Sequence, residues 1–171
     1  MLPKGLRQML IVDAMTTEDW PEVARIYQEG MDTNLATFQT ACPSYEQWDA
    51  GHLPHSRLIL RDSSATVGWA ALASVSNRCV YAGVSEVSVY IDTQYQGRGL
   101  GERLLKALIR LSVDNGIWTL QSQIMRDNAA SIRLHDKCGF RMVGYREKLG
   151  QDRNNVWRDT VLMERREPSI N

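Results

Sequence analysis

Hydrophobic and polar residues recur with two different periods along the chain, and these periods separate strands from helices. Short runs rich in β-branched and aromatic residues predict strands, whereas apolar residues three or four positions apart predict helices. The predicted strands are residues 9–13, 57–61, 66–74, 84–91, 118–125, 140–145 and 156–163. The predicted helices are one capped by Thr16 or Thr17 and ended by Gly30, a short one from Ser44 to Trp48, one that opens within 94–101 and ends near 115–116, and 129–137.

The element order places hairpins in the middle and at the end of the chain, with strands and helices alternating in the second half. This order predicts an α/β (or α+β) protein with a mixed, twisted sheet of about seven strands and helices on both faces. A length of 171 residues is enough for one well-buried core and short for two. We therefore expect a single domain over 9–165, with short tails over 1–8 and 166–171.

Composition narrows the class of partner. The chain has 20 Lys and Arg against 20 Asp and Glu, so its bulk charge favours neither nucleic acid nor an anionic membrane. It has no apolar run of membrane-spanning length and no signal-peptide pattern. Three cysteines without paired spacing fit a reducing cytoplasm. No Cys-x-x-Cys pattern or acidic cluster accompanies His52 and His55, so no metal is expected.

The stretch 84–102 joins a predicted buried strand to a glycine-rich turn and a helix. Gly97, Gly99 and Gly101 let the backbone turn its N–H groups toward one point, where the helix dipole adds positive potential that suits a phosphate. The spacing excludes the dinucleotide fingerprint G-x-G-x-x-G, and the lack of Gly-Lys-Ser/Thr excludes a P-loop. The pattern that remains is Q-x-x-G-x-G with Arg98 inside it, which by itself also fits an ordinary glycine-rich turn.

Two motifs together resemble the GCN5-related N-acetyltransferase (GNAT) superfamily. The Q-x-x-G-x-G pattern is similar to its acetyl-CoA pyrophosphate loop, and Asn128-Ala-Ala-Ser followed by Gly139-Phe140 is similar to its second motif. The likeness narrows, through Glu86-Val-Ser-Val-Tyr90, to the branch that acetylates phosphinothricin, methionine sulfone and some L-amino acids. Further matches, which extend the resemblance over roughly residues 9–165, are Thr37-Phe38, Arg78, Tyr81, His135 and Trp157-Arg-Asp159.

The resemblance implies a GNAT fold, a homodimer, and direct transfer of an acetyl group from acetyl-CoA to the α-amino group of a small amino acid or analogue. Phosphinothricin, methionine sulfoximine and methionine sulfone are the implied acceptor types. The residues that would contact acetyl-CoA are Val89, Tyr90, Ile91, Gln96, Gly97, Arg98, Gly99, Leu100, Gly101, Glu102 and Asn128. Those that would line the acceptor site are Phe38, Arg78, Tyr81, Glu86, Val87, Ser88 and Trp157.

Glu86 and His135 are the two candidates for proton transfer. A carboxylate in an otherwise apolar strand needs a partner or a purpose, and burial would make it a stronger base. His135 stands where many superfamily members have a tyrosine that protonates the leaving thiolate, and a histidine exchanges protons near neutral pH. The plainer alternatives are a structural ion pair for Glu86 and simple packing for His135.

Two other functions stay open. Gln39 and Asn155 stand where the branch usually has Glu and Gly, so the acceptor could be another amine, such as a protein N-terminus, a polyamine or an aminoglycoside. A polycation would favour an acidic cleft, for which Asp32, Glu46 and Asp49 are too few and scattered. A non-catalytic CoA-binding module is the second alternative, and the presence of both Glu86 and His135 argues against it.

Overall fold

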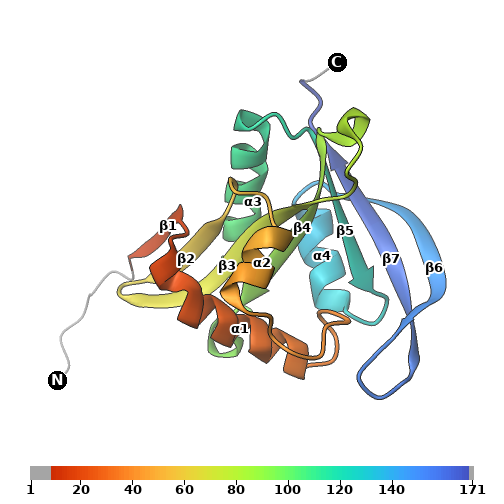
Figure 1. Ribbon diagram of the computed structural model, residues 1–171, viewed down its shortest axis with the longest axis horizontal. Coiled ribbons are helices and arrows are strands. Elements are labelled where there is room, and N and C mark those ends of the chain that lie inside the picture. The colour runs from red at the N-terminus through yellow and green to blue at the C-terminus, as the bar shows by residue number, and fades with distance from the viewer. Residues whose placement is uncertain (1–8, 170–171) are drawn as a thin grey trace.

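The computed structural model describes residues 9–169, and these form one seven-stranded sheet with four α-helices (Figure 1). The predicted tail over 1–8 lies outside the described residues. The strands are β1 (Leu10–Ala14), β2 (Leu58–Asp62), β3 (Ala65–Ser74), β4 (Val84–Ile91), β5 (Thr119–Met125), β6 (Arg141–Gln151) and β7 (Trp157–Arg166). The helices are α1 (Trp20–Asp32), α2 (Tyr45–Gly51), α3 (Leu100–Asp114) and α4 (Ala129–Lys137).

The strands lie in the order β1-β2-β3-β4-β5-β7-β6. Neighbouring strands are antiparallel, except that β4 and β5 are parallel. The mixed sheet that the element order predicted is therefore confirmed. Within the part of the chain that is described, no helix is both long and apolar enough to span a membrane.

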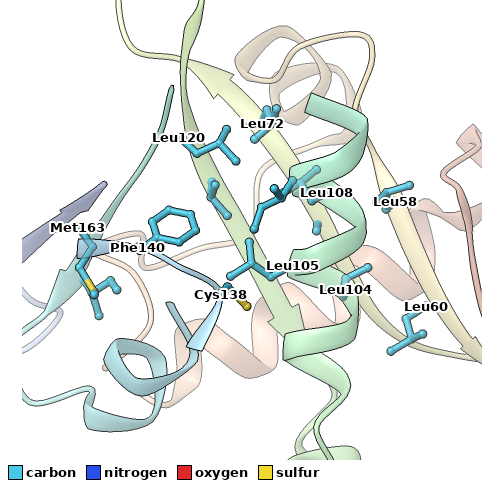
Figure 2. Packing of buried hydrophobic residues seen from close by; sticks show 14 of the residues in the cluster. Leu58, Leu60, Leu72, Leu104, Leu105, Leu108, Leu120, Cys138, Phe140 and Met163 are labelled. Atoms are coloured by element: carbon cyan, nitrogen blue, oxygen red, sulfur yellow. The ribbon is translucent and has the colours of Figure 1, made fainter. Parts of the chain in front are cut away.

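Alternation along β2 divides the core between the two faces of the sheet. Leu58 and Leu60 belong to the cluster on the α3 side, whereas Ile59, between them, packs in a second cluster with α1 and α2. Figure 2 shows the α3 leucines that fill the first cluster: Leu104, Leu105 and Leu108. Each fully buried leucine contributes about 1.5–3 kcal/mol, so this seam fixes α3, and with it the turn at its N-terminus, against the sheet.

Four predicted boundaries are wrong by two residues or more. Helix α2 ends at Gly51 rather than at Trp48. Helix α1 continues past Gly30 to Asp32, because Gly30 serves packing rather than termination: a Cβ there would lie 2.6 Å from Cδ1 of Tyr90. Strand β6 continues to Gln151 instead of ending at 145. Its residues are mostly exposed, and its hydrogen-bonded pairing with β7 holds it as a strand. Strand β7 reaches Arg166, the first residue of the predicted C-terminal tail.

Strands β4 and β5 pair along only a short stretch, Val84–Glu86 with Thr119–Gln121. Beyond it, β4 continues alongside β3 while β5 continues alongside β7, and the two strands diverge (Figure 1). From Val87 onward, β4 is therefore paired on one side only. Its other edge carries backbone N–H and C=O groups that are available to a further extended partner.

Candidate active site

Glu86 occupies the last paired position of β4 before the strands diverge. Its neighbours Ser85 and Val87 are buried on the α3 side, so Glu86 projects to the face that α1 and α2 cover. The residue is half-buried, and its Oε2 accepts a hydrogen bond from Nε2 of Gln121, 3.3 Å away. The fold thus places a carboxylate at the point where β4 and β5 separate.

The side chains of the next five residues of β4 point alternately to the two faces of the sheet. Val87 is buried in the α3-side cluster and Val89 and Ile91 pack against that cluster, so their side chains are occupied and their backbone groups remain. Tyr90 places its ring in the opposite cluster. Ser88 is half-buried on the same face as Glu86. Among these residues, Ser88 is the one on the Glu86 face whose side chain belongs to neither core cluster.

A tight turn carries the chain from β4 into α3. Gly97 and Gly99 have φ values of +75° and +74°, a left-handed region that residues with a Cβ rarely adopt. Within residues 9–169, no atom beyond the adjacent residues lies within 4 Å of where a Cβ would stand at either glycine, so the space beside the turn is open. Gly99 is also the N-cap of α3, whose first amide N–H groups have no partner inside the helix. The turn and the helix start together fit the requirements of a pyrophosphate site.

Two charged side chains flank this turn. The guanidinium of Arg98 donates to a backbone carbonyl of the same turn at 3.0 Å and lies 4.9 Å from the centre of the Tyr95 ring. Glu102, in the first turn of α3, forms an ion pair with Lys106 at 2.6 Å, which offsets a negative charge that would repel phosphate. Three further predicted contacts lie in the turn or at the helix start: Gln96, Leu100 and Gly101.

Asn128 begins α4 and fixes its position. Its Oδ1 accepts a hydrogen bond from the N–H of Ser131, which caps the helix, and its Nδ2 donates to the carbonyl of Leu35 at 3.2 Å. The side chain therefore ties the start of α4 to the long segment between α1 and α2. Its predicted contact with acetyl-CoA stays a prediction.

His135 lies in the last turn of α4 and is 3% exposed. Its Nδ1 donates to the carbonyl of Ser131, 2.8 Å away, and because a carbonyl can only accept, the proton is on Nδ1. Nε2 has no hydrogen-bond partner within residues 9–169. Burial lowers the pKa of His135 by more than the bond to Ser131 raises it. The ring is therefore neutral near pH 7, and Nε2 is a buried, unpartnered acceptor.

The predicted acceptor residues come from two parts of the surface. Arg78 and Tyr81 lie in the exposed turn that leads into β4, with the guanidinium carbon 5.6 Å from the centre of the tyrosine ring. Phe38 lies against Gly150 of β6, where a Cβ would come within 3.1 Å of its ring. Trp157, at the start of β7, is 55% exposed and stands one position along from Gly150 in the β6–β7 pairing. The aromatic residues are thus not part of either core.

A groove of about 730 Å³ lies beside the start of β4 and β5. Tyr81, Trp118 and Gln121 line it, together with polar groups from β6 and β7. It opens on the face of the sheet to which Glu86 projects, because Gln121 and Glu86 are partners in the β4–β5 pairing. The groove thus reaches the register partner of Glu86 on the same face of the sheet. The described residues contain no group of three or more His, Cys, Asp or Glu placed to hold a metal.

Sequence reasoning missed a clasp that joins three segments around Arg158. The Arg158 guanidinium donates to both carboxylate oxygens of Asp127, at 2.9 and 2.8 Å, and to Asp152 at 2.9 Å. It also donates to the carbonyl of Asn34, whose side chain donates to Asp152. Burial raises the pKa of Asp152, but the hydrogen bonds from Arg158, Asn34 and two backbone amides lower it further, so it stays ionised. Asp152 is 6 residues from Arg158, but Asp127 and Asn34 are 31 and 124 residues away, so no local pattern signals the clasp.

Comparison with known proteins assigns the class. Residues 20–140 match the model of the acetyltransferase (GNAT) family, which is more than half of the chain. The diverging strands, the glycine turn and the carboxylate therefore belong to an acetyltransferase, and the chain is a member of the GNAT family.

Relatives within the family narrow the resemblance. The chain is 31% identical over 164 residues to the phosphinothricin N-acetyltransferase of Alcaligenes faecalis, covering 90% of this chain and 81% of that protein. It is 28% identical over 152 residues to the L-methionine sulfoximine/L-methionine sulfone acetyltransferase of Pseudomonas aeruginosa, covering 85% and 88%. The predicted likeness to this branch is confirmed.

A solved structure shows the same fold. The phosphinothricin acetyltransferase of Sinorhizobium meliloti, crystallised in complex with AcCoA, superposes with a TM-score of 0.82 at 24% identity. The match covers 92% of this chain and 88% of that one. The predicted GNAT fold is therefore confirmed.

Proposed function

We propose that this enzyme transfers the acetyl group of acetyl-CoA to the α-amino group of a small amino acid or analogue of the phosphinothricin, methionine sulfoximine or methionine sulfone type. The observation that carries the proposal is the position of Glu86, at the last paired residue before β4 and β5 diverge. A ligand that pairs with the free edge of β4 would present its reacting end beside this carboxylate. The names of the relatives support the acceptor class.

The chain offers acetyl-CoA two kinds of contact. The backbone groups of Val89 and Ile91 point to the free edge of β4, which suits the amides of an extended pantetheine arm, whereas those of Tyr90 point toward Trp69 of β3. The left-handed turn and the start of α3 suit the pyrophosphate, with Arg98 close enough to the turn to add positive charge. Acetyl-CoA would supply an activated thioester, so the protein needs to form no covalent intermediate of its own.

Proton transfer is the chemical task left to the side chains. Glu86 takes the proton that the acceptor ammonium loses, directly or through a water, and the free amine then bonds to the thioester carbon as the carbon–sulfur bond breaks. Once the nitrogen is bonded to the thioester carbon it must lose a second proton, and His135, which is neutral with an unpartnered Nε2, takes up that proton and returns it to the leaving sulfur. Each of the two side chains therefore has to be able to accept a proton before the reaction begins.

Arg78 would bind the carboxylate of the acceptor amino acid. This guanidinium is exposed, and its described side-chain contact is the face of Tyr81, which leaves its N–H donors available to a carboxylate. Ser88, Phe38 and Trp157 would line the rest of the acceptor site.

We also propose that the enzyme is a homodimer in the cytoplasm. The β6–β7 arm exposes large apolar side chains that a homodimer would cover: Met142, Val143, Tyr145, Leu149, Val156 and Trp157. The three cysteines are free thiols, which supports a reducing compartment.

A thiol-release assay with acetyl-CoA and a panel of amines tests the proposal. The panel contains phosphinothricin, methionine sulfoximine, methionine sulfone, common L-amino acids, an N-terminal peptide, spermidine and an aminoglycoside. We expect turnover with the amino-acid analogues, and Glu86→Gln should lower kcat by about 10²- to 10⁴-fold while acetyl-CoA still binds. Glu46→Gln, an exposed glutamate on α2, is the matched control.

The other outcomes separate the rival functions. Turnover with the polycations or the peptide alone would refute the acceptor class and keep the enzyme class. Binding of acetyl-CoA with no turnover on any amine would favour the non-catalytic module. Full activity of Glu86→Gln across the pH range would remove Glu86 from the mechanism.

A further inference from the structure

A row of polar side chains crosses the sheet beside the proposed base. Glu86 of β4 is the register partner of Gln121 in β5, Gln121 is the partner of Glu164 in β7, and Glu164 is the partner of Arg141 in β6. Register partners project to the same face of a sheet. The four side chains therefore form one line across four neighbouring strands, ending at the carboxylate of Glu86.

The contacts along this row fix the direction of the Gln121 amide. Its nitrogen lies 3.3 Å from Oε2 of Glu86, and an ionised carboxylate can only accept, so Gln121 donates. On the other side of Gln121, the carboxylate of Glu164 is paired with Arg141 at 2.9 Å. Because that second carboxylate already has a cationic partner, it competes less for the amide hydrogens of Gln121.

Within the described residues, the neighbouring strands give the Glu86 side chain no hydrogen-bonding partner beyond Gln121. On the β3 side its partner is Ala73, whose methyl group offers no hydrogen bond, and the following residues of β4 have no β5 partner. A glutamate with three rotatable side-chain bonds loses conformational entropy when it is held in one place. The bond from Gln121 is the one described side-chain contact that restricts the carboxylate of Glu86.

We propose that Gln121 is the positioning residue for Glu86, and that its amide holds the carboxylate at the divergence of β4 and β5 in the orientation that receives the acceptor proton. This inference rests on the proposed function of Glu86. It assigns Gln121 no contact with the reacting atoms: the residue acts through Glu86 alone.

A double-mutant cycle tests this dependence. Gln121→Leu keeps most of the volume and removes the donor, and we expect kcat to fall about 3- to 10-fold, the value of one hydrogen bond, with the acetyl-CoA KM unchanged. In the Glu86→Gln background the same substitution should change kcat by less than about twofold, because the carboxylate base that Gln121 orients is absent. Gln121→Glu keeps the shape but sets a second carboxylate against Glu86, so its loss should exceed that of Gln121→Leu.

The chain offers a matched control two residues away. Gln123 lies on the same face of the same strand, but its amide donates to Oγ1 of Thr160 at 2.9 Å instead of to Glu86. Gln123→Leu should leave kcat within about twofold in both backgrounds, even if it lowers the melting temperature as much as Gln121→Leu does.

Each contrary outcome has a distinct meaning. Equal losses from Gln121→Leu with and without Glu86 would overturn the inference, since they would show a role independent of the carboxylate. Wild-type activity of Gln121→Glu would also overturn it, by showing that the residue only fills space. If Glu86→Gln retains full activity, or the wild type acetylates no amine, then the proposed function fails first and the inference falls with it.

Discussion

The turn that precedes α3 requires two things of residue 99: a left-handed backbone and open space for a pyrophosphate. Two substitutions at this position can test the requirements separately. The backbone demand is a φ of +74°, which costs a residue with a Cβ about 1–2 kcal/mol. No atom lies within 4 Å of the position that a Cβ would take, so Gly99→Ala introduces this strain without a clash. For a chain of this length, each kcal/mol lowers the melting temperature by about 2–4 °C, so we expect a fall of about 2–8 °C.

The second demand is open space for the pyrophosphate. Asparagine adopts left-handed conformations more readily than alanine, so Gly99→Asn should lose less stability than Gly99→Ala. Its longer side chain would nevertheless occupy the space beside the N–H groups of the turn. If a hydrogen bond to a charged phosphate is lost, acetyl-CoA affinity should fall about tenfold or more. The turn would then be stable but a poorer ligand site.

Thermal unfolding and calorimetric titration with acetyl-CoA measure the two demands separately. Gly51→Ala is the control, because Gly51 also has nothing within 4 Å of a Cβ but has no left-handed φ. It should leave both measurements unchanged or raise the melting temperature slightly. A Gly99→Ala protein as stable as the wild type would refute the strain argument. A Gly99→Asn protein with wild-type affinity would refute the assignment of this turn to the pyrophosphate.

Three further predictions follow from single contacts. Arg78→Ala should raise KM for amines that carry a carboxylate, and an equal rise for amines that lack one would contradict the proposed contact between Arg78 and the acceptor carboxylate. Gly30→Ala should destabilise the fold by about 1–3 kcal/mol in chemical denaturation, because the new Cβ meets the buried ring of Tyr90 at 2.6 Å; an unchanged midpoint would show that the ring moves freely. The lowered pKa of Asp152 means that its stabilising effect is complete above about pH 4 and is lost as pH falls below that value. Asp152→Asn should therefore unfold with a shallower pH dependence below pH 4, and an unaltered acid transition would exclude the clasp as its cause.

Local interactions explain what could be read from the chain alone. The order of strands and helices followed from apolar periodicity, and the glycine pattern before α3 followed from the backbone freedom that its φ values require. The family resemblance pointed to Glu86, which does lie where β4 and β5 diverge. These features depend on neighbours within a few positions, so a single stretch of sequence carries the information.

Boundaries were less predictable where packing overrode local signals. Gly30 is a usual helix terminator, yet α1 continues through it because the missing side chain makes room for Tyr90 from β4. Strand β6 shows no alternation of buried and exposed residues, so only its pairing with β7 reveals that it reaches Gln151. In both cases the deciding partner lies on another element.

The relations within the site were decided by tertiary structure alone. Glu86 and Gln121 are 35 residues apart, and only the register of two parallel strands makes them partners. Asn34 and Asp152 are separated by 118 residues, and only the folding of the β6–β7 hairpin against the segment after α1 brings them together. Short-range interactions therefore made the elements and the glycine turn predictable, whereas the base candidate Glu86 came from the family resemblance. The groove, the polar row and the clasp required the fold, because each is built from residues that the chain alone leaves far apart.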